Sequence, residues 1–199
     1  MPGILGRDAP GRLCARTDRH PSAVVTLGDG ITIREVAAAE IEPLGRLTVA
    51  AYQGVPGFDP GDGYMAELGD VARRADLAVV LVAVDARDGL LGGVTYVPGP
   101  GPYFEWEGSD DAGIRMLAVA PEARGRGVGT ALVGVCVARA RVEGRRRVWL
   151  HTTPEMTVAH RIYERQGFRR APAADWRGEL CLWAYSLVLS GEELGAAPT

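Results

Sequence analysis

The chain has 199 residues, of which 47% are hydrophobic and 24% are charged, and its formal net charge is −3. This length and composition are typical of one globular domain and exclude disordered, collagen-like and multi-span membrane chains. The slightly acidic balance gives no reason to expect a nucleic-acid partner.

The cysteines and the two ends of the chain indicate the compartment and the domain boundaries. Cys14, Cys136 and Cys181 are odd in number and lack metal-ligand spacing, which predicts no metal site and a reducing, cytoplasmic setting. No apolar run is long enough to span a membrane, and the N-terminus lacks a signal-peptide core. We therefore expect a flexible leader over residues 1–28, a folded domain over 29–190 and a flexible tail over 191–199.

The first half of the domain alternates between helical and strand patterns. Apolar residues that alternate along the chain or form short runs predict strands, and spacings of three and four residues predict helices. Glycine, proline and aspartate mark the loop between the two helices. The predicted elements are a strand at 31–36, a helix at 37–52, a loop at 53–63, a helix at 64–75, and an antiparallel hairpin of strands at 77–84 and 90–97.

The segment between Val97 and Gly113 combines aromatic and acidic side chains with helix-breaking glycines and prolines. Aromatic faces interleaved with carboxylates would suit an organic cation, which makes Glu105, Trp106 and Asp111 candidate substrate-binding residues. The alternative is a solvated loop whose aromatic rings cap the core. The sequence leaves both readings open.

A strand, a glycine-rich turn and a helix follow in immediate succession. The run from Ile114 to Ala120 is apolar except for Arg115 and predicts a buried strand. Glycines at 125, 127 and 129 then precede an apolar helix. Because this arrangement directs free backbone N–H groups at one point, it predicts a phosphate site. A Walker loop is excluded since the chain contains no lysine, and the glycine spacing differs from the dinucleotide fingerprint.

The C-terminal part completes a βαβ unit and two further strands. The predicted strand at 146–152 lies parallel to the strand at 114–120 because a helix connects them. Thr153 can cap a helix with Pro154 at its first position, and Gly167 can end it. A short strand begins at Phe168, and the apolar strand at 180–189 is either central in the sheet or part of a homodimer contact.

Two motifs resemble those of the GCN5-related N-acetyltransferase (GNAT) family. Arg124, Gly127 and Gly129 match its acetyl-CoA signature, [R/Q]-x-x-G-x-[G/A], directly after a strand. The family's A-x-x-x-Y-x-x-x-G-F appears downstream, in matching order, as AHRIYERQGF. The resemblance covers about residues 30 to 189.

The resemblance implies an α/β fold with a mixed central sheet in the order βααβββαβαββ, flanked by helices. Acetyl-CoA would then lie in the splay between two parallel strands, with its pyrophosphate at the glycine-rich turn. Met156 stands where the family often has an asparagine that contacts the pantetheine. The implied cofactor-binding residues are Leu117, Ala118, Val119, Arg124, Gly125, Arg126, Gly127, Val128, Gly129, Thr130, Met156 and Ala159.

Acetyl transfer to an amine requires a stabilised oxyanion, a protonated thiol leaving group and a base, because alkyl amines are mostly protonated near neutral pH. The resemblance implies the backbone N–H of Leu117 for the oxyanion and Tyr163 as general acid, and a purely structural tyrosine is the alternative. Where some family members carry a glutamate base, this chain has Gly113, and where others carry one it has His151. His151 is thus the candidate base. It could equally fill the sheet surface, with Glu105, Asp110 or Asp111 acting through water.

The sequence thus predicts an acetyl-CoA-dependent N-acetyltransferase whose acceptor is a small, cationic primary amine. Two alternatives stay open: acetylation of protein N-termini or lysines, and a catalytically weak acyl-CoA-binding regulatory domain. The sequence does not identify the acceptor.

Overall fold

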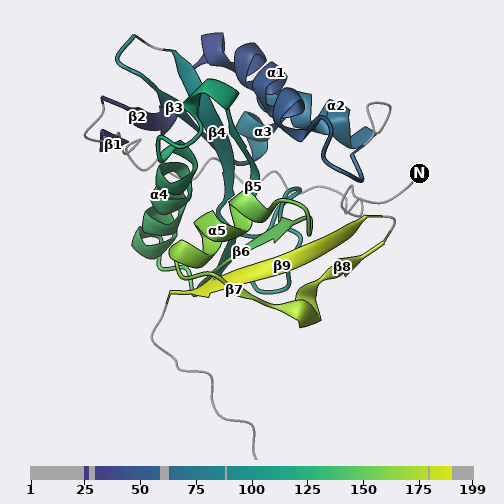
Figure 1. The fold of residues 1–199 in the computed structure, drawn as a ribbon. Coiled ribbons are helices and arrows are strands. Elements are labelled where there is room, and N and C mark those ends of the chain that lie inside the picture. The colour runs from purple at the N-terminus through teal and green to yellow at the C-terminus, as the bar shows by residue number, and fades with distance from the viewer. Residues whose placement is uncertain (1–24, 27–29, 59–62, 88, 179, 190–199) are drawn as a thin grey trace, which may run out of the picture.

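A mixed sheet with helices on both faces forms the structure (Figure 1), a computed structural model that describes residues 25–26, 30–58, 63–87, 89–178 and 180–189. The strand order is β1-β2-β3-β4-β5-β6-β9-β7, and β8 pairs with β9. The strands are β1 (Val25–Thr26), β2 (Thr32–Glu35), β3 (Val79–Val84), β4 (Leu90–Val97), β5 (Asp111–Val119), β6 (Arg147–Thr152), β7 (Arg169–Arg170), β8 (Trp176–Arg177) and β9 (Cys181–Val188). The helices are α1 (Ile41–Tyr52), α2 (Gly63–Gly69), α3 (Val71–Leu77), α4 (Val128–Val142) and α5 (Thr157–Arg165), with 3-10 turns at Ala38–Glu40, Pro121–Ala123 and Pro172–Ala174.

Strand pairing confirms the predicted mixed sheet. β3 and β4 form the predicted antiparallel hairpin, and β5 and β6 pair in parallel through α4. The last strand, β9, lies between β6 and β7, so its apolar sequence reflects an interior position in the sheet.

The two faces of the sheet bury separate apolar clusters. Along β3, Leu81 and Ala83 join the large cluster that includes the apolar side of α4. Their neighbours Val80, Val82 and Val84 instead pack with Leu44 of α1 and Val71 of α3. Since successive side chains of a strand point to opposite faces, α4 and the pair α1 and α3 cover opposite sides of the sheet (Figure 1).

The predicted helix over 64–75 is in fact two helices. α2 ends at Gly69, and Asp70 begins α3, since its carboxylate accepts a hydrogen bond of 3.0 Å from the backbone N–H of Arg73. An aspartate at this position satisfies a free N–H at the start of a new helix, which explains the break.

The start of α5 was also predicted wrongly. Thr153 does not cap it: its carbonyl accepts a 3.2 Å hydrogen bond from the N–H of Met156, and this turn delays the helix to Thr157. The helix does end just before Gly167, whose φ is +89°.

Some short elements were not predicted at all. β8 is one, and β1 pairs with β2 although Val25 and Thr26 fall within the expected leader. The rest of the expected leader up to residue 24, and the tail over 191–199, lie outside the described residues.

Candidate functional site

The parallel strands β5 and β6 separate partway along their length. Their register runs from Asp111 opposite Arg147 to Ile114 opposite Leu150 and stops there. β5 nevertheless continues to Val119 and β6 to Thr152. Beyond Ile114 the facing edges of the two strands are therefore not paired with each other. This is the predicted splay, and it exposes strand edges to which an extended ligand could hydrogen bond.

A cavity of about 520 Å³, its open mouth included, lies where the strands separate. β5 and the end of β6 form its floor, and residues from the ends of α1 and α2 and the start of β9 wall it. The lining residues are Tyr52, Phe58, Tyr64, Glu105, Ile114, Arg115, Met116, His151, Thr152, Thr153, Met156, Leu180 and Leu182.

A bulge interrupts β5 beside this cavity. Gly93 of β4 pairs with Ala118 and Thr95 pairs with Arg115, so Met116 and Leu117 together occupy the place of one residue. Met116 has a φ of +53°, the one positive φ of a non-glycine residue in the described part of the chain. Such a bulge bends the strand and redirects backbone groups, and Leu117 lies within it.

The glycine-rich turn leads directly into the N-terminus of α4. Gly125 and Gly127 have φ values of +77° and +79°, and a Cβ atom added to either would meet no atom within 4 Å. Arg124 and Arg126 of the same turn are exposed, whereas Val128 and Gly129 are buried and Thr130 is half-buried. α4 has 15 residues and begins directly after Gly127. Its first free N–H groups and the positive end of its dipole therefore face this open turn. The turn has the form of a phosphate cradle.

The remaining predicted cofactor residues border the splay. Ala118 and Val119 are the last two residues of β5 and pair with Gly93 and Gly92 of β4. Met156 lines the cavity, and Ala159 on α5 packs against the main core. A Cβ on Gly129 would lie 3.0 Å from Ile162 Cδ1, so α4 and α5 approach each other closely beside the turn.

Tyr163 is buried on α5 and does not line the cavity. Its side chain is 5% exposed, and its ring centroid lies 6.0 Å from that of Phe168 and 6.1 Å from that of Tyr185. Burial, and then Tyr185, raise the pKa of the Tyr163 hydroxyl, so it keeps its proton at neutral pH. Burial also raises the pKa of Tyr52 in the cavity wall, and Tyr64 and Tyr163 add to that effect.

Glu105 and Arg115 form an ion pair inside the cavity. Arg115 Nη1 lies 2.7 Å from Glu105 Oε1, with the two side chains 8% and 22% exposed. Burial alone would raise the pKa of Glu105, but His151 and Arg115 outweigh it and hold that pKa below its ordinary value. Glu105 is therefore a carboxylate at neutral pH. Glu67 Oε1 lies further away, 4.0 Å from Arg115 Nη2.

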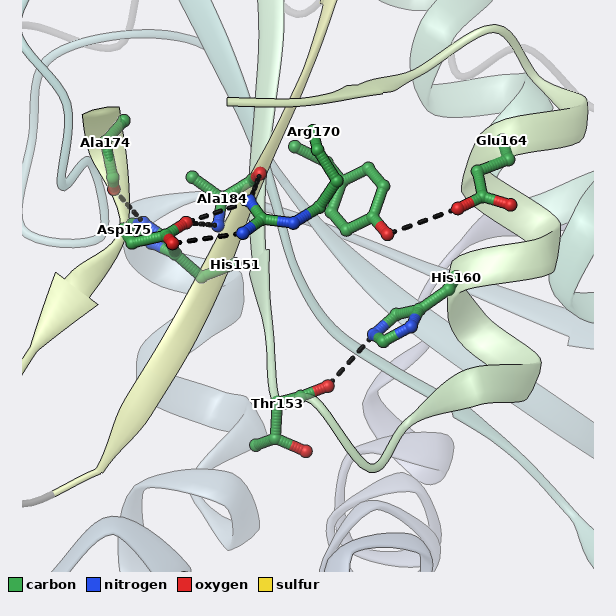
Figure 2. A network of polar contacts seen from close by, with 9 residues as sticks. His151, Thr153, His160, Glu164, Arg170, Ala174, Asp175 and Ala184 are labelled. Carbon is green, nitrogen blue, oxygen red and sulfur yellow. Dashed lines mark hydrogen bonds and ion pairs between the residues drawn. The ribbon is translucent and has the colours of Figure 1, made fainter. Parts of the chain in front are cut away.

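His151 is held at both ring nitrogens. Nδ1 lies 3.3 Å from Glu105 Oε2, and Nε2 lies 3.1 Å from the carbonyl oxygen of Ala174, as Figure 2 shows for the latter. A carbonyl oxygen only accepts, so Nε2 carries a proton in this arrangement. The two predicted alternatives for the base, His151 and a carboxylate of the acidic loop, are thus in contact with each other.

A second ion pair fixes the segment that contacts His151 (Figure 2). Arg170 binds both carboxylate oxygens of Asp175, at 2.8 and 3.0 Å, and the N–H of Ala184 donates to the same carboxylate at 2.9 Å. Asp175 directly follows Ala174 in the chain. The position of the Ala174 carbonyl therefore depends on this ion pair.

Replacing Asp175 by asparagine should destabilise the protein by about 1.5 kcal/mol at pH 7, since hydrogen bonds to a charged group are lost. The hydrogen bond from Arg170 lowers the pKa of Asp175, against the opposing effect of burial. Its stabilisation is thus present above the ordinary pKa of 3.8 and disappears as the pH falls through the lower folded value. Denaturant titrations from pH 3 to 8 should show the two proteins converging at the acid end, while the exposed Asp76→Asn control matches wild type throughout. A constant difference between the proteins would contradict this assignment.

Trp106 and Asp111 lie differently from the prediction of a cation site. The Trp106 ring stacks on His151 at 5.2 Å between centroids, and on Trp149 at 6.4 Å. It covers Gly113 so closely that a Cβ there would lie 2.4 Å from a Trp106 ring carbon. Asp111 Oδ2 accepts a 2.8 Å hydrogen bond from Trp149 Nε1, and neither Asp111 nor Trp106 lines the cavity. Position 113 is therefore glycine because the tryptophan packs flat upon it.

Several cavity residues were missed in the sequence. Tyr52, Phe58 and Tyr64 come from the ends of two helices and the loop between them, and Phe58 stacks on Tyr64 at 5.4 Å. Aromatic residues on either side of a glycine- and proline-rich loop were the available signal. Arg115 was visible as the one charge within an apolar strand.

Two negative findings apply to the described part of the chain. It contains no group of three or more histidine, cysteine, aspartate or glutamate side chains that could hold a metal ion. None of its helices is both long and apolar enough to cross a membrane.

Comparisons with known proteins agree with this geometry. The profile of the acetyltransferase (GNAT) family matches residues 48–168. A mycothiol acetyltransferase of Cellulomonas flavigena is 28% identical over 180 residues, covering 80% of this chain and 46% of that protein. The chain thus spans about half the length of this relative.

Solved structures share the fold. A GCN5-related N-acetyltransferase from Kribbella flavida superposes with a TM-score of 0.59 at 26% identity, covering 80% of this chain and 98% of that one. The Salmonella typhimurium protein yncA, whose structure contains its cofactor acetyl-CoA, has a TM-score of 0.62 at 18% identity, with coverages of 85% and 98%.

Proposed function

The chain belongs to the acetyltransferase (GNAT) family, and from this premise we propose that it transfers an acetyl group from acetyl-CoA to a small primary amine. The observation that carries the proposal is the continuity of the site. The open glycine-rich turn at the N-terminus of α4 adjoins the splay of β5 and β6, and the splay opens into the cavity.

The residues of the chain fit acetyl-CoA. Gly125 and Gly127 leave open space where a side chain would obstruct a phosphate, and the helix N-terminus favours its charge. Beyond Ile114, the strand edges offer backbone groups to an amide-bearing arm. When bound, acetyl-CoA supplies the acetyl thioester that the amine attacks.

Each chemical requirement of the transfer has a candidate group. The N–H of Leu117 in the bulge of β5 would stabilise charge on the carbonyl oxygen. Tyr163, whose raised pKa keeps its hydroxyl protonated, would give a proton to the leaving sulfur. The cavity walls of Tyr52, Phe58 and Tyr64 would exclude water from the acceptor.

The base is the pair formed by His151 and Glu105. Because their contact joins an ionised carboxylate to a ring nitrogen, proton uptake by either member changes the other. An ammonium that enters the cavity would lose its proton to this pair, directly or through water.

This pairing predicts strongly non-additive kinetics. His151→Ala and Glu105→Gln should each lower kcat/KM about tenfold, and the double variant should be little worse than either single one. Asp111→Asn is the matched control, because Asp111 belongs to the same acidic segment but binds Trp149 outside the cavity. Independent, multiplicative losses in the double variant would separate the two residues and reject the pair as the base.

The proposed function is tested by incubating the protein with acetyl-CoA and a panel of primary amines while free thiol is measured. Amine-dependent thiol release supports it. Release only with peptides would favour the alternative of protein acetylation. Tight acetyl-CoA binding without any amine-dependent release would instead indicate a regulatory acyl-CoA-binding domain.

The acidic loop gives no support to the expected positive charge on the acceptor. Glu105 is already engaged by Arg115 and His151, and Asp111 by Trp149. The primary amine therefore remains the proposed acceptor group, and the charge on the rest of the acceptor must be inferred from the other groups around the cavity.

A further inference from the structure

A fully buried arginine lies behind the cavity wall without a carboxylate partner. Arg74 of α3 is 1% exposed, and among the described residues no carboxylate oxygen lies within ion-pair distance of it. Its Nη2 donates to the carbonyl oxygen of Leu68 at 3.0 Å, and its Nη1 donates to Met116 Sδ at 2.6 Å. Its buried Nε has no hydrogen-bond partner.

This environment compensates the guanidinium poorly. A thioether sulfur is a weak acceptor, so one carbonyl oxygen is the strong partner that Arg74 has. Burial accordingly lowers the pKa of Arg74, with partial relief from Tyr103, Tyr52, Tyr64 and Glu67. A buried cation without a counter-ion is unfavourable and is rare in folded proteins unless a charge partner arrives with a ligand.

Met116 connects Arg74 to the cavity. One side of the Met116 side chain contacts Arg74, and the residue also lines the cavity beside Arg115. Met116 occupies the left-handed region at a φ of +53°, which indicates that the surrounding structure imposes its position. A group bound against Met116 would therefore lie one side chain away from the Arg74 charge, in a medium where charges interact strongly.

The carboxylates around the cavity lie against Arg115 and not against Arg74. The two oxygens of Glu105 face Arg115 and His151, at 2.7 and 3.3 Å. The remaining carboxylate nearby, Glu67, lies 4.0 Å from Arg115 Nη2. Both carboxylates thus lie against Arg115, and among the described residues Arg74 is left without a carboxylate within ion-pair distance.

We propose that the acceptor carries a carboxylate beside its primary amine, and that Arg74, acting across Met116, selects it. The acceptor class is therefore an amino acid or a related amino carboxylate with an apolar body, which suits the walls formed by Tyr52, Phe58 and Tyr64. This inference rests on the proposed function, because it concerns the acceptor of the same reaction.

The test compares L-phenylalanine with L-phenylalaninamide, which have the same size and differ in the carboxylate. We expect Arg74→Met to lower the ratio of their kcat/KM values about tenfold relative to wild type, since one charge interaction is removed. The two amines differ in basicity, but that difference is the same for both proteins and cancels in the comparison. Arg139→Met removes a partly exposed arginine of α4 that pairs with Glu35 and Glu143, and should leave the ratio unchanged.

A binding measurement keeps the inference falsifiable if the variant does not fold or if no amine is acetylated. With wild-type protein saturated with CoA, calorimetry should show 3-phenylpropionate binding about tenfold more tightly than 3-phenylpropanamide. Equal binding of the two, or an unchanged kinetic ratio in folded Arg74→Met, overturns the carboxylate assignment. Carboxylate binding without acetylation of any amine would reject the proposed function and with it the assignment of this carboxylate to an acceptor, whereas equal binding beside acetylation of amines would overturn this inference alone.

Discussion

Replacing Tyr163 by phenylalanine should lower kcat by about 10²-fold or more and leave acetyl-CoA affinity nearly unchanged, because a proton donor that acts on the leaving group contributes mainly in the transition state. The side chain is buried among Phe168 and Tyr185, and burial raises the pKa of its hydroxyl. A phenylalanine would retain the aromatic contacts and remove the proton. Stopped-flow turnover and calorimetric acetyl-CoA binding measure the two quantities separately.

Two matched variants decide whether the effect belongs to Tyr163. Tyr185→Phe removes the hydroxyl of the adjacent buried tyrosine, which donates to Glu164 at 3.3 Å, and should retain most activity. Tyr52→Phe removes a hydroxyl in the cavity wall itself. If Tyr52→Phe loses turnover while Tyr163→Phe retains it, the proton donor is Tyr52, and the role given to Tyr163 is wrong.

The features that could be predicted from the sequence are those encoded locally. The glycines at 125 and 127 adopt positive φ values in the structure, and the apolar segments on either side form β5 and α4. The splay followed from the resemblance, and the end of the β5–β6 register at Ile114 and Leu150 confirms it. Short-range patterns suffice here because the turn, the strand and the helix are consecutive in the chain.

The charges of the cavity could not be predicted because they depend on contacts between distant segments. Glu105 contacts Arg115 of β5 and His151 of β6, and Arg74 of α3 contacts Met116 of β5. In the sequence, Arg74 is an ordinary charged residue of a helix, and no periodic pattern indicates that it is buried without a counter-ion. Its guanidinium donates to the carbonyl oxygen of Leu68 across the break between α2 and α3, which the sequence analysis missed.

The partners of the carboxylates in the acidic loop could not be predicted from the sequence either. Its composition suggested attraction of a cation, but composition does not reveal which carboxylates already have partners within the protein. Trp106 covers Gly113, and this contact brings Glu105 next to His151 while Asp111 turns to Trp149. The loop therefore supplies structural contacts and one cavity carboxylate, and that carboxylate is already paired with Arg115.

Replacing Gly127 by valine should weaken acetyl-CoA binding by about 100-fold, which corresponds to the loss of two hydrogen bonds to charged groups of about 1.5 kcal/mol each. Gly127 is the N-cap of α4 with a φ of +79°, and a Cβ there would occupy the open space that faces the N–H groups of the helix start. A β-branched residue at this φ is also strained, so the variant should be less stable by about 1–2 kcal/mol.

Gly144 provides the control that separates strain from binding. It follows the C-terminus of α4 with a φ of +68°, and a Cβ there would likewise meet no atom within 4 Å. Gly144→Val should therefore show a similar loss of stability in thermal unfolding and unchanged calorimetric affinity for acetyl-CoA. Equal affinities for acetyl-CoA in the two folded variants would mean that the turn does not hold the phosphates. The Gly127 substitution would then act only through the backbone strain that both variants share.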